Sequence, residues 1–133
     1  MITSRPGAQA LAVDTAVPPF DDELAGLFED LRGFGPEIDA ALDAFLRIAV
    51  GKHSADRSQT LLAILAGNGP NFTTLIARLV ARLGDSDQNP ALRGLPVDRQ
   101  DQARELTAQY AHYDDQFAPH DLISETTAVI DGH

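Results

Sequence analysis

The sequence has no cysteine and no tryptophan, and its aromatic residues are six phenylalanines and two tyrosines in 133 residues. Without cysteine the chain has no disulfide, no thiolate metal site and no thiol nucleophile. Alanine and leucine supply most of the apolar side chains, which favours closely packed helices over a sheet. We therefore predict an all-α fold.

Long hydrophobic runs are also missing. No apolar run approaches the length of a membrane span, and residues 1–19 lack the cationic start and apolar core of a signal peptide. We expect a cytoplasmic protein with no membrane contact. The chain of 133 residues is long enough for one domain, and its 44% apolar residues are enough to build one core.

Basic residues are few, and the formal net charge is −10. Residues 14–51 hold nine carboxylates and two arginines, and residues 105–133 hold six carboxylates with no Lys or Arg, whereas residues 52–104 are slightly basic. Acidic surfaces repel phosphate backbones, so nucleic acid is not the first partner expected. The acidic ends either keep the protein in solution or dock on a basic partner. The arginine, alanine and aspartate usage suggests a bacterial or phage genome.

The clearest pattern is a stripe of large apolar residues at intervals of three and four over residues 71–83. It consists of Phe72, Leu75, Ile76, Leu79, Val80 and Leu83. This spacing predicts an amphipathic helix whose stripe packs against another surface. A helix that packs on a neighbouring molecule has the same period, so the pattern does not say which surface the stripe covers.

The same period predicts helices over residues 20–32 and 36–50 and a third helix capped by Ser54. Glycine and proline end or begin these segments at residues 33–36, 51 and 67–70. A fifth helix, capped by Asp98, carries Leu106, Tyr110 and Tyr113 on its core face and reaches residue 115.

The predicted organisation is a compact bundle of four to five short helices. Residues 1–19 form an extended arm, residues 20–117 a single helical domain, and residues 118–133 a tail that is partly extended or a short helix. The arm has alternating apolar residues, and it either becomes ordered along the surface of a partner or folds loosely over its own core. The candidate partner contacts on the arm and first helix are Leu11, Val13, Val17, Asp21, Asp22, Glu29 and Asp30.

Reactive side chains do not form a recognisable catalytic set. His112, Asp115 and His120 are the best candidates for a metal site, but no paired helical motif of metal ligands is present. No serine lies in a nucleophile elbow, and the glycines of residues 67–71 lack the lysine and serine or threonine of a phosphate-binding loop. We predict no enzyme activity and no cofactor.

Helices over residues 58–66 and 71–83, joined by a short turn, also allow a helix-turn-helix interpretation. Arg78, Arg82 and Arg93 would then contact DNA phosphates. Our first hypothesis is a non-enzymatic protein interaction module, a small structural or accessory subunit that binds a protein partner or itself. The DNA-binding regulator is the alternative, and a small metal-binding or enzymatic protein with a site near His112 is the second alternative.

Overall fold

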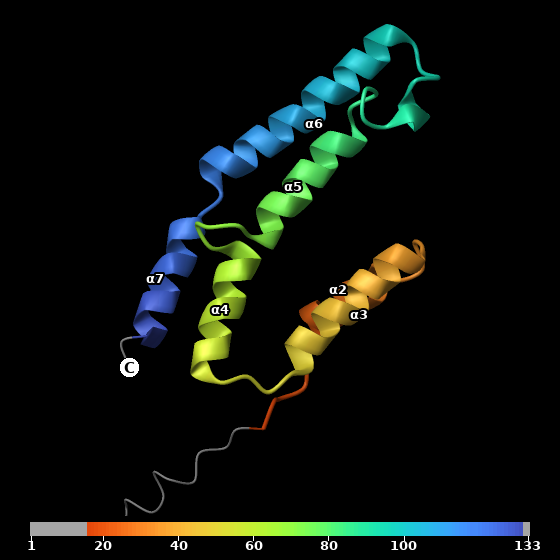
Figure 1. The fold of residues 1–133 in the computed structure, drawn as a ribbon. Helices are drawn as coiled ribbons and strands as arrows, with labels where there is room; N and C mark the ends of the chain where they lie inside the picture. The colour runs from red at the N-terminus through yellow and green to blue at the C-terminus, as the bar shows by residue number, and fades with distance from the viewer. Residues whose placement is uncertain (1–15, 132–133) are drawn as a thin grey trace, which may run out of the picture. The chain divides into compact units, whose positions relative to one another are not determined.

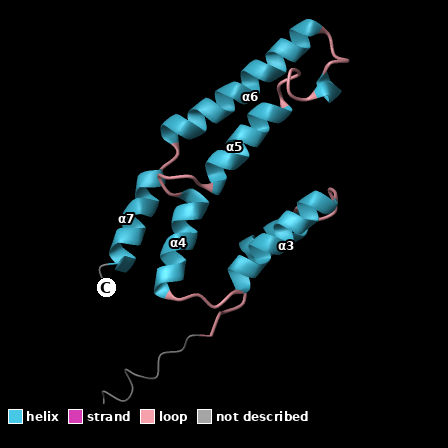
Figure 2. Cartoon of the chain, viewed as in Figure 1, coloured by secondary structure: helices cyan, strands magenta, loops and turns pink. Residues whose placement is uncertain are grey.

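The computed structural model describes residues 16–131, and these residues form helices joined by turns and short loops, with no strand (Figures 1 and 2). The all-α prediction is confirmed. None of the described helices combines the length and apolarity that crossing a membrane requires. The helices in chain order are α2 (Asp22–Asp30), α3 (Pro36–Val50), α4 (Ala55–Ala66), α5 (Phe72–Leu83), the short 3₁₀ turn η1 (Pro90–Leu92), α6 (Val97–Phe117) and α7 (His120–Asp131).

Local signals in the sequence set most helix ends. The side chains of Asp21, Ser54 and Asn71 accept hydrogen bonds from the first-turn amides of α2, α4 and α5. Each bond satisfies an amide that has no partner within its own helix. Pro36 begins α3, and Gly51 follows its last residue, as predicted.

The start of α6 differs from the prediction. Pro96, not Asp98, is the N-cap, and no side chain caps this end. The expected Asp98 cap is wrong because the Pro96 carbonyl already accepts from the amides of Arg99 and Gln100, so the helix begins before Asp98. Asp98 lies in the first turn, where its charge still favours the helix dipole.

The tail is a helix over most of its length, since α7 follows α6 after a break at residues 118–119. Of the two alternatives for residues 118–133, a short helix is therefore found and an extended strand is not, over the residues described. Of the predicted arm, only residues 16–19 are described, and they have no regular structure.

The chain divides into two units, residues 1–53 and residues 54–133. The boundary falls within residues 20–117, for which we predicted one domain. The division does not test whether these residues fold as one domain, so that expectation stays a prediction.

Unit 1 contains α2 and α3, which are joined by a turn at residues 31–35. Gly33 and Gly35 have φ angles of 93° and 124°, a conformation that glycine adopts without strain. The turn is fastened by an ion pair of 2.7 Å from Arg32 to Asp43 and by a 3.1 Å hydrogen bond from the Gly33 amide to Asp39. Apolar side chains of both helices line a pocket of about 200 Å³, namely Leu24, Leu27, Phe28, Leu31, Leu42 and Phe45.

Unit 2 consists of two helix pairs. Helix α5 lies along α6, and α4 lies along α7, while α4 and α5 meet only near the turn that joins them (Figure 1). The chain therefore passes upward through α4 and α5 in Figure 1 and returns through α6 and α7. No further helix of residues 54–131 lies along the α5–α6 pair.

Candidate interaction surface

Small residues make the contact between α5 and α6. Ala77 of α5 is 1% exposed and Ala111 of α6 is 3% exposed. Gly84, at the end of α5, lies directly against the side chain of Thr107. Small side chains let two helix axes approach closely, but they bury little apolar area.

The large apolar residues of α5 lie on another side of the helix. Ile76 is 48% exposed and Leu83 is 64% exposed, and Leu75 and Leu79 are also about half exposed. These four residues of the stripe are therefore not covered by the helices of unit 2. The physical reason is that the side of α5 that faces α6 carries Ala77 and Gly84. Ile76 and Leu83 each precede one of these residues and therefore point about 100° away around the helix.

Helix α6 repeats this arrangement. Leu106, Tyr110, Tyr113 and Phe117 are at least half exposed, with Phe117 at 72%, and the rings of Tyr113 and Phe117 lie 5.6 Å apart. The predicted core role of Leu106, Tyr110 and Tyr113 is therefore wrong. The α6 residues that face α5 are again the small ones, so these larger side chains have no helix of unit 2 to pack against.

The exposed residues of the two helices lie on one face of the pair. In α5, Ile76 and Leu83 come one residue before the contact residues Ala77 and Gly84, and in α6, Leu106 and Tyr110 come one residue before Thr107 and Ala111. When two helices are antiparallel, the residues that come one position before their contact residues point to the same side of the pair. We call this side the apolar face; it consists of Ile76, Leu83, Leu106, Tyr110, Tyr113 and Phe117, with Leu75 and Leu79 along the outer edge of α5.

The apolar face is larger than an ordinary surface patch. Six large side chains that are about half exposed present roughly 100 Å² each, or about 600 Å² in total. The largest patch on a typical monomer is about 300 to 600 Å², and patches at this limit mark binding sites. The face is therefore the strongest candidate for a functional surface in the described residues.

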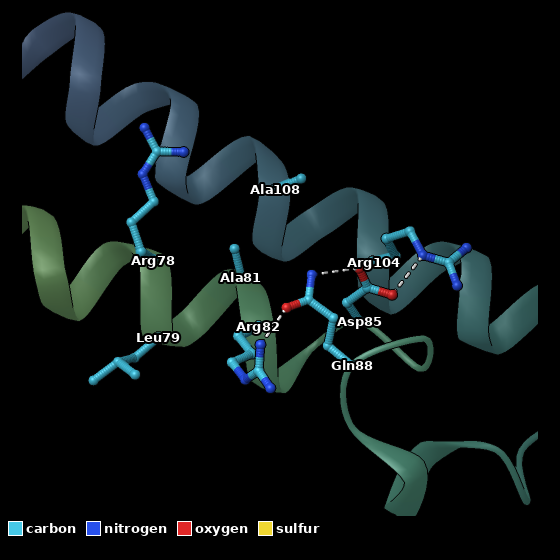
Figure 3. Close-up of a pocket in the computed structure, with 8 residues that line it drawn as sticks. All are labelled: Arg78, Leu79, Ala81, Arg82, Asp85, Gln88, Arg104 and Ala108. Atoms are coloured by element: carbon cyan, nitrogen blue, oxygen red, sulfur yellow. Dashed lines mark hydrogen bonds and ion pairs between the residues drawn. The ribbon is translucent and has the colours of Figure 1, made fainter.

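The opposite side of the pair is polar. The residues that line a pocket of about 420 Å³ there are Arg78, Leu79, Ala81, Arg82, Asp85, Gln88, Arg104 and Ala108 (Figure 3). Arg104 donates to Asp85 at 3.0 Å, to Asp101 at 3.0 Å and to the buried Ser86 hydroxyl at 2.9 Å. This hydrogen bonding from Arg104, with a smaller contribution from the Asp87 amide, holds the pKa of Asp85 below its usual value. The cluster fastens the loop after α5 to α6.

The candidate metal ligands are not brought together. Asp115 accepts an ion-pair hydrogen bond from Arg78, and a ring nitrogen of His120 lies 2.7 Å from the Ala66 carbonyl oxygen. The His112 ring instead lies beside that of Tyr113. Among the residues described, no three His, Asp or Glu side chains are grouped so that they could hold a metal ion.

One polar atom was not expected from the sequence. Asp114 Oδ2 is buried without a hydrogen-bond partner, in a pocket of about 230 Å³ that also contains Thr73 and His120 and is otherwise mostly apolar. The His120 ring already contacts the Ala66 carbonyl, so the pocket presents one carboxylate and one hydroxyl. Only the position of Asp114 at the end of α6, which the sequence did not distinguish from Asp115, could have indicated it.

The three arginines of the DNA-binding alternative have partners within unit 2. Arg78 pairs with Asp115, Arg82 donates to Gln88 at 2.6 Å, and Arg93 donates to the carbonyls of Ser86 and Asp87. The two helices of the proposed helix-turn-helix pack along different helices, α7 and α6. The alternative stays a prediction, and no observation in the structure favours it.

The arm and α2 candidates are placed only in part. Leu11 and Val13 lie outside the described residues. Val17 lines a pocket of about 330 Å³ with Pro18, Pro19, Phe20 and Val50. Asp21 caps α2 through a 2.8 Å hydrogen bond from the Leu24 amide, and Asp22, Glu29 and Asp30 are exposed on the same helix.

Comparison with known proteins does not add a function. No protein-family model, no curated protein and no solved structure matches this chain.

Proposed function

We propose that this protein is a non-enzymatic interaction module, a small structural or accessory subunit that works by binding another protein chain. The observation that supports the proposal is the apolar face, on which six large side chains of α5 and α6 are exposed along one side of a helix pair. The candidate partner contacts of the arm and α2, which are three apolar residues and four carboxylates, remain part of this proposal.

The size of the face is sufficient for a specific contact. Covering about 600 Å² of apolar surface at about 25 cal/mol per Å² contributes on the order of 15 kcal/mol before the costs of association. Those costs are about 4 to 15 kcal/mol for lost translation and rotation. The net result is a contact that ranges from marginal to tight, which suits a subunit of an assembly.

A pair of substitutions on the face tests the proposal. We expect Ile76→Glu with Tyr110→Glu to keep the helical circular dichroism of the wild-type chain, because both side chains are already about half exposed. The same variant should no longer bind other chains. The measurement is the mass of the particle by light scattering, which should fall, or binding to a purified partner protein, which should be lost. Ala108→Glu, on the polar side of α6, is the matched control and should change neither property.

One outcome would contradict the proposal. If the wild-type chain is monomeric and the double substitution unfolds it, then the face is part of this chain's own core. That outcome would overturn the proposal.

A further inference from the structure

We propose that Asn68 is a site of spontaneous deamidation and that helix α7 controls the rate of this reaction. Asn68 and Gly69 are adjacent in the turn between α4 and α5, and both residues are exposed. Deamidation converts the side-chain amide of an asparagine into a carboxylate, so the chain gains one negative charge. The site lies in the turn and does not depend on the apolar face.

The sequence of the turn is suited to this reaction. Deamidation begins when the backbone nitrogen that follows an asparagine attacks the carbon of the side-chain amide, and a side chain on the attacking residue hinders the approach. Gly69 has no side chain and has the widest choice of backbone conformations. The two other asparagines precede Phe72 and Pro90, and Pro90 has no N–H that could react. Asn68 is therefore the asparagine that reacts first.

The reaction needs only water. The Gly69 nitrogen forms a bond to Cγ of Asn68, the bond from Cγ to Nδ2 breaks, and Nδ2 leaves as ammonia with the proton of the Gly69 amide. The intermediate is a five-membered cyclic imide. Water then adds to one of the two carbonyl carbons of the imide and opens the ring, which gives aspartate or isoaspartate at position 68.

The backbone of the turn leaves the attacking nitrogen accessible. Residues 67–70 are not helical, and in the described part of the chain the Gly69 amide donates no hydrogen bond. Apart from its neighbours in the chain, nothing lies within 4 Å of a Cβ atom built on Gly69. The turn can therefore supply the reacting nitrogen without unfolding of α4 or α5.

The side chain of Asn68, in contrast, is held by α7, which lies along α4 (Figure 1). Its Nδ2 donates to Oδ1 of Asp121 at 3.0 Å and to Oγ of Ser124 at 2.8 Å. Nδ2 is the atom that leaves as ammonia, and the two hydrogen bonds also fix the direction of Cγ. Deamidation is therefore slow while α7 is packed, and it becomes faster when α7 detaches.

The product changes the contact that protected the asparagine. An aspartate in place of Asn68 has an acceptor oxygen where the donor Nδ2 lay, so the hydrogen bond to the Asp121 carboxylate is lost. The new carboxylate also lies next to that of Asp121, and like charges at this separation repel each other. Deamidation should therefore weaken the packing of α7 on α4.

The experiment follows deamidation of the full-length chain by mass spectrometry during incubation at neutral pH, with peptide mapping to locate the change. The wild-type chain should convert at Asn68 before either of the other asparagines. Gly69→Ala should lose this conversion and keep its fold, because a Cβ atom at this position has free space. Peptide mapping is needed because Asp131 also precedes a glycine and can form isoaspartate without loss of ammonia.

Ser124→Ala tests the control by α7. This variant removes one of the two acceptors of Asn68 and keeps a residue that favours helix. Its conversion should be about fivefold faster than that of the wild type, the factor that corresponds to the loss of one hydrogen bond of ordinary net strength. Thr126→Ala is the matched control on the same helix, because the Thr126 hydroxyl bonds only the Leu122 carbonyl, and it should convert at the wild-type rate. A peptide of residues 65–72 gives the unrestrained rate, which should exceed that of the full chain.

Two results would overturn the proposal. If the peptide converts but neither the full-length chain nor Ser124→Ala does, then Asn68 is not a deamidation site in the folded protein. If the full-length chain converts as fast as the peptide and Ser124→Ala has no effect, then α7 does not control the rate.

The effect of the product on α7 has its own test. Asn68→Asp introduces the carboxylate directly, and Asn68→Ala removes the same donor without adding charge. We expect Asn68→Asp to unfold at a lower urea concentration than Asn68→Ala, with a difference that shrinks at high salt because salt screens the repulsion from Asp121. Equal stability of the two variants would overturn the inferred repulsion.

Discussion

The ionic cluster around Arg104 is the best-defined arrangement at the scale of single residues. One guanidinium bonds Asp85 and Asp101 and the buried Ser86 hydroxyl, and the Ser86 carbonyl in turn accepts from Arg93. The Arg104 side chain is 35% exposed and that of Asp101 is 64% exposed, so solvent weakens their ion pair. The main effect of the cluster is to fix the geometry of the loop. The loop is thereby held against the first turns of α6.

The lowered pKa of Asp85 gives a prediction for pH dependence. The hydrogen bond from Arg104 holds the folded-state pKa below the usual value near 3.8. The carboxylate therefore stabilises the fold at higher pH, and this contribution is lost as the pH falls below 3.8 through the folded-state pKa. We expect Asp85→Asn to lower the free energy of unfolding at pH 7 and the difference from wild type to shrink in acid.

Urea unfolding at a series of pH values measures this difference. Arg104→Met removes the same interaction from the other side, so the double variant should lose less stability than the two single losses added together. A pH-independent difference, or simple additivity, would contradict the assignment of the shift to Arg104.

At the scale of elements, α5 shows how one helix can have two apolar directions. The small residues Ala77 and Gly84 face α6, and the large residues Ile76 and Leu83 face away from the rest of unit 2. The close approach depends on the absence of a side chain at Gly84. A Cβ atom built there would lie 2.5 and 2.8 Å from Cγ2 and Cβ of Thr107 and closer still to its hydroxyl.

Gly84→Ala should therefore destabilise the α5–α6 contact. Its backbone φ of −86° suits any residue, so the cost is steric, about 1 to 3 kcal/mol for an overpacked contact. Thermal unfolding followed by circular dichroism measures the loss. Thr107→Ala removes the two nearest atoms but keeps the Cβ at 2.8 Å, so the double variant should recover part of the lost stability. No recovery at all would contradict the contact between the two residues.

At the scale of the whole molecule, three pairs of helices in residues 54–131 pack together. The most extensive contact is between α5 and α6, followed by that between α4 and α7, and α4 and α5 contact each other least. All these pairs lie in unit 2, which begins at Ser54, the residue that also caps α4. A unit whose helices contact one another can fold without its neighbour.

We expect the fragment 54–133, expressed alone, to be helical and to unfold cooperatively. Circular dichroism and a urea titration test this, with the full-length chain as the reference. A fragment without helical signal would contradict the prediction and would favour the single domain over residues 20–117. If the full-length chain self-associates and the fragment forms particles with the same number of copies in light scattering, then self-association lies in unit 2.

The sequence alone determined most of the helical segments, because that information is local, but it left residues 118–133 open between a short helix and an extended tail. Spacings of three and four, the caps at Asp21, Ser54 and Asn71, and the glycines and prolines between segments act within a few residues. The start of α6 was misplaced because the Pro96 carbonyl accepts from the amides of Arg99 and Gln100, so the helix begins before Asp98. The ends of α2 and the C-terminal end of α6 differ from the prediction by two residues.

Only the tertiary structure decided which side of each helix is covered. A stripe of large apolar residues has the same period whether it faces its own chain or another molecule. In this protein the inner contact is made by Ala77, Gly84, Thr107 and Ala111, and the larger side chains remain exposed. The same holds for Arg78 and Arg104, because their partners Asp115 and Asp85 lie 37 and 19 residues away in the chain.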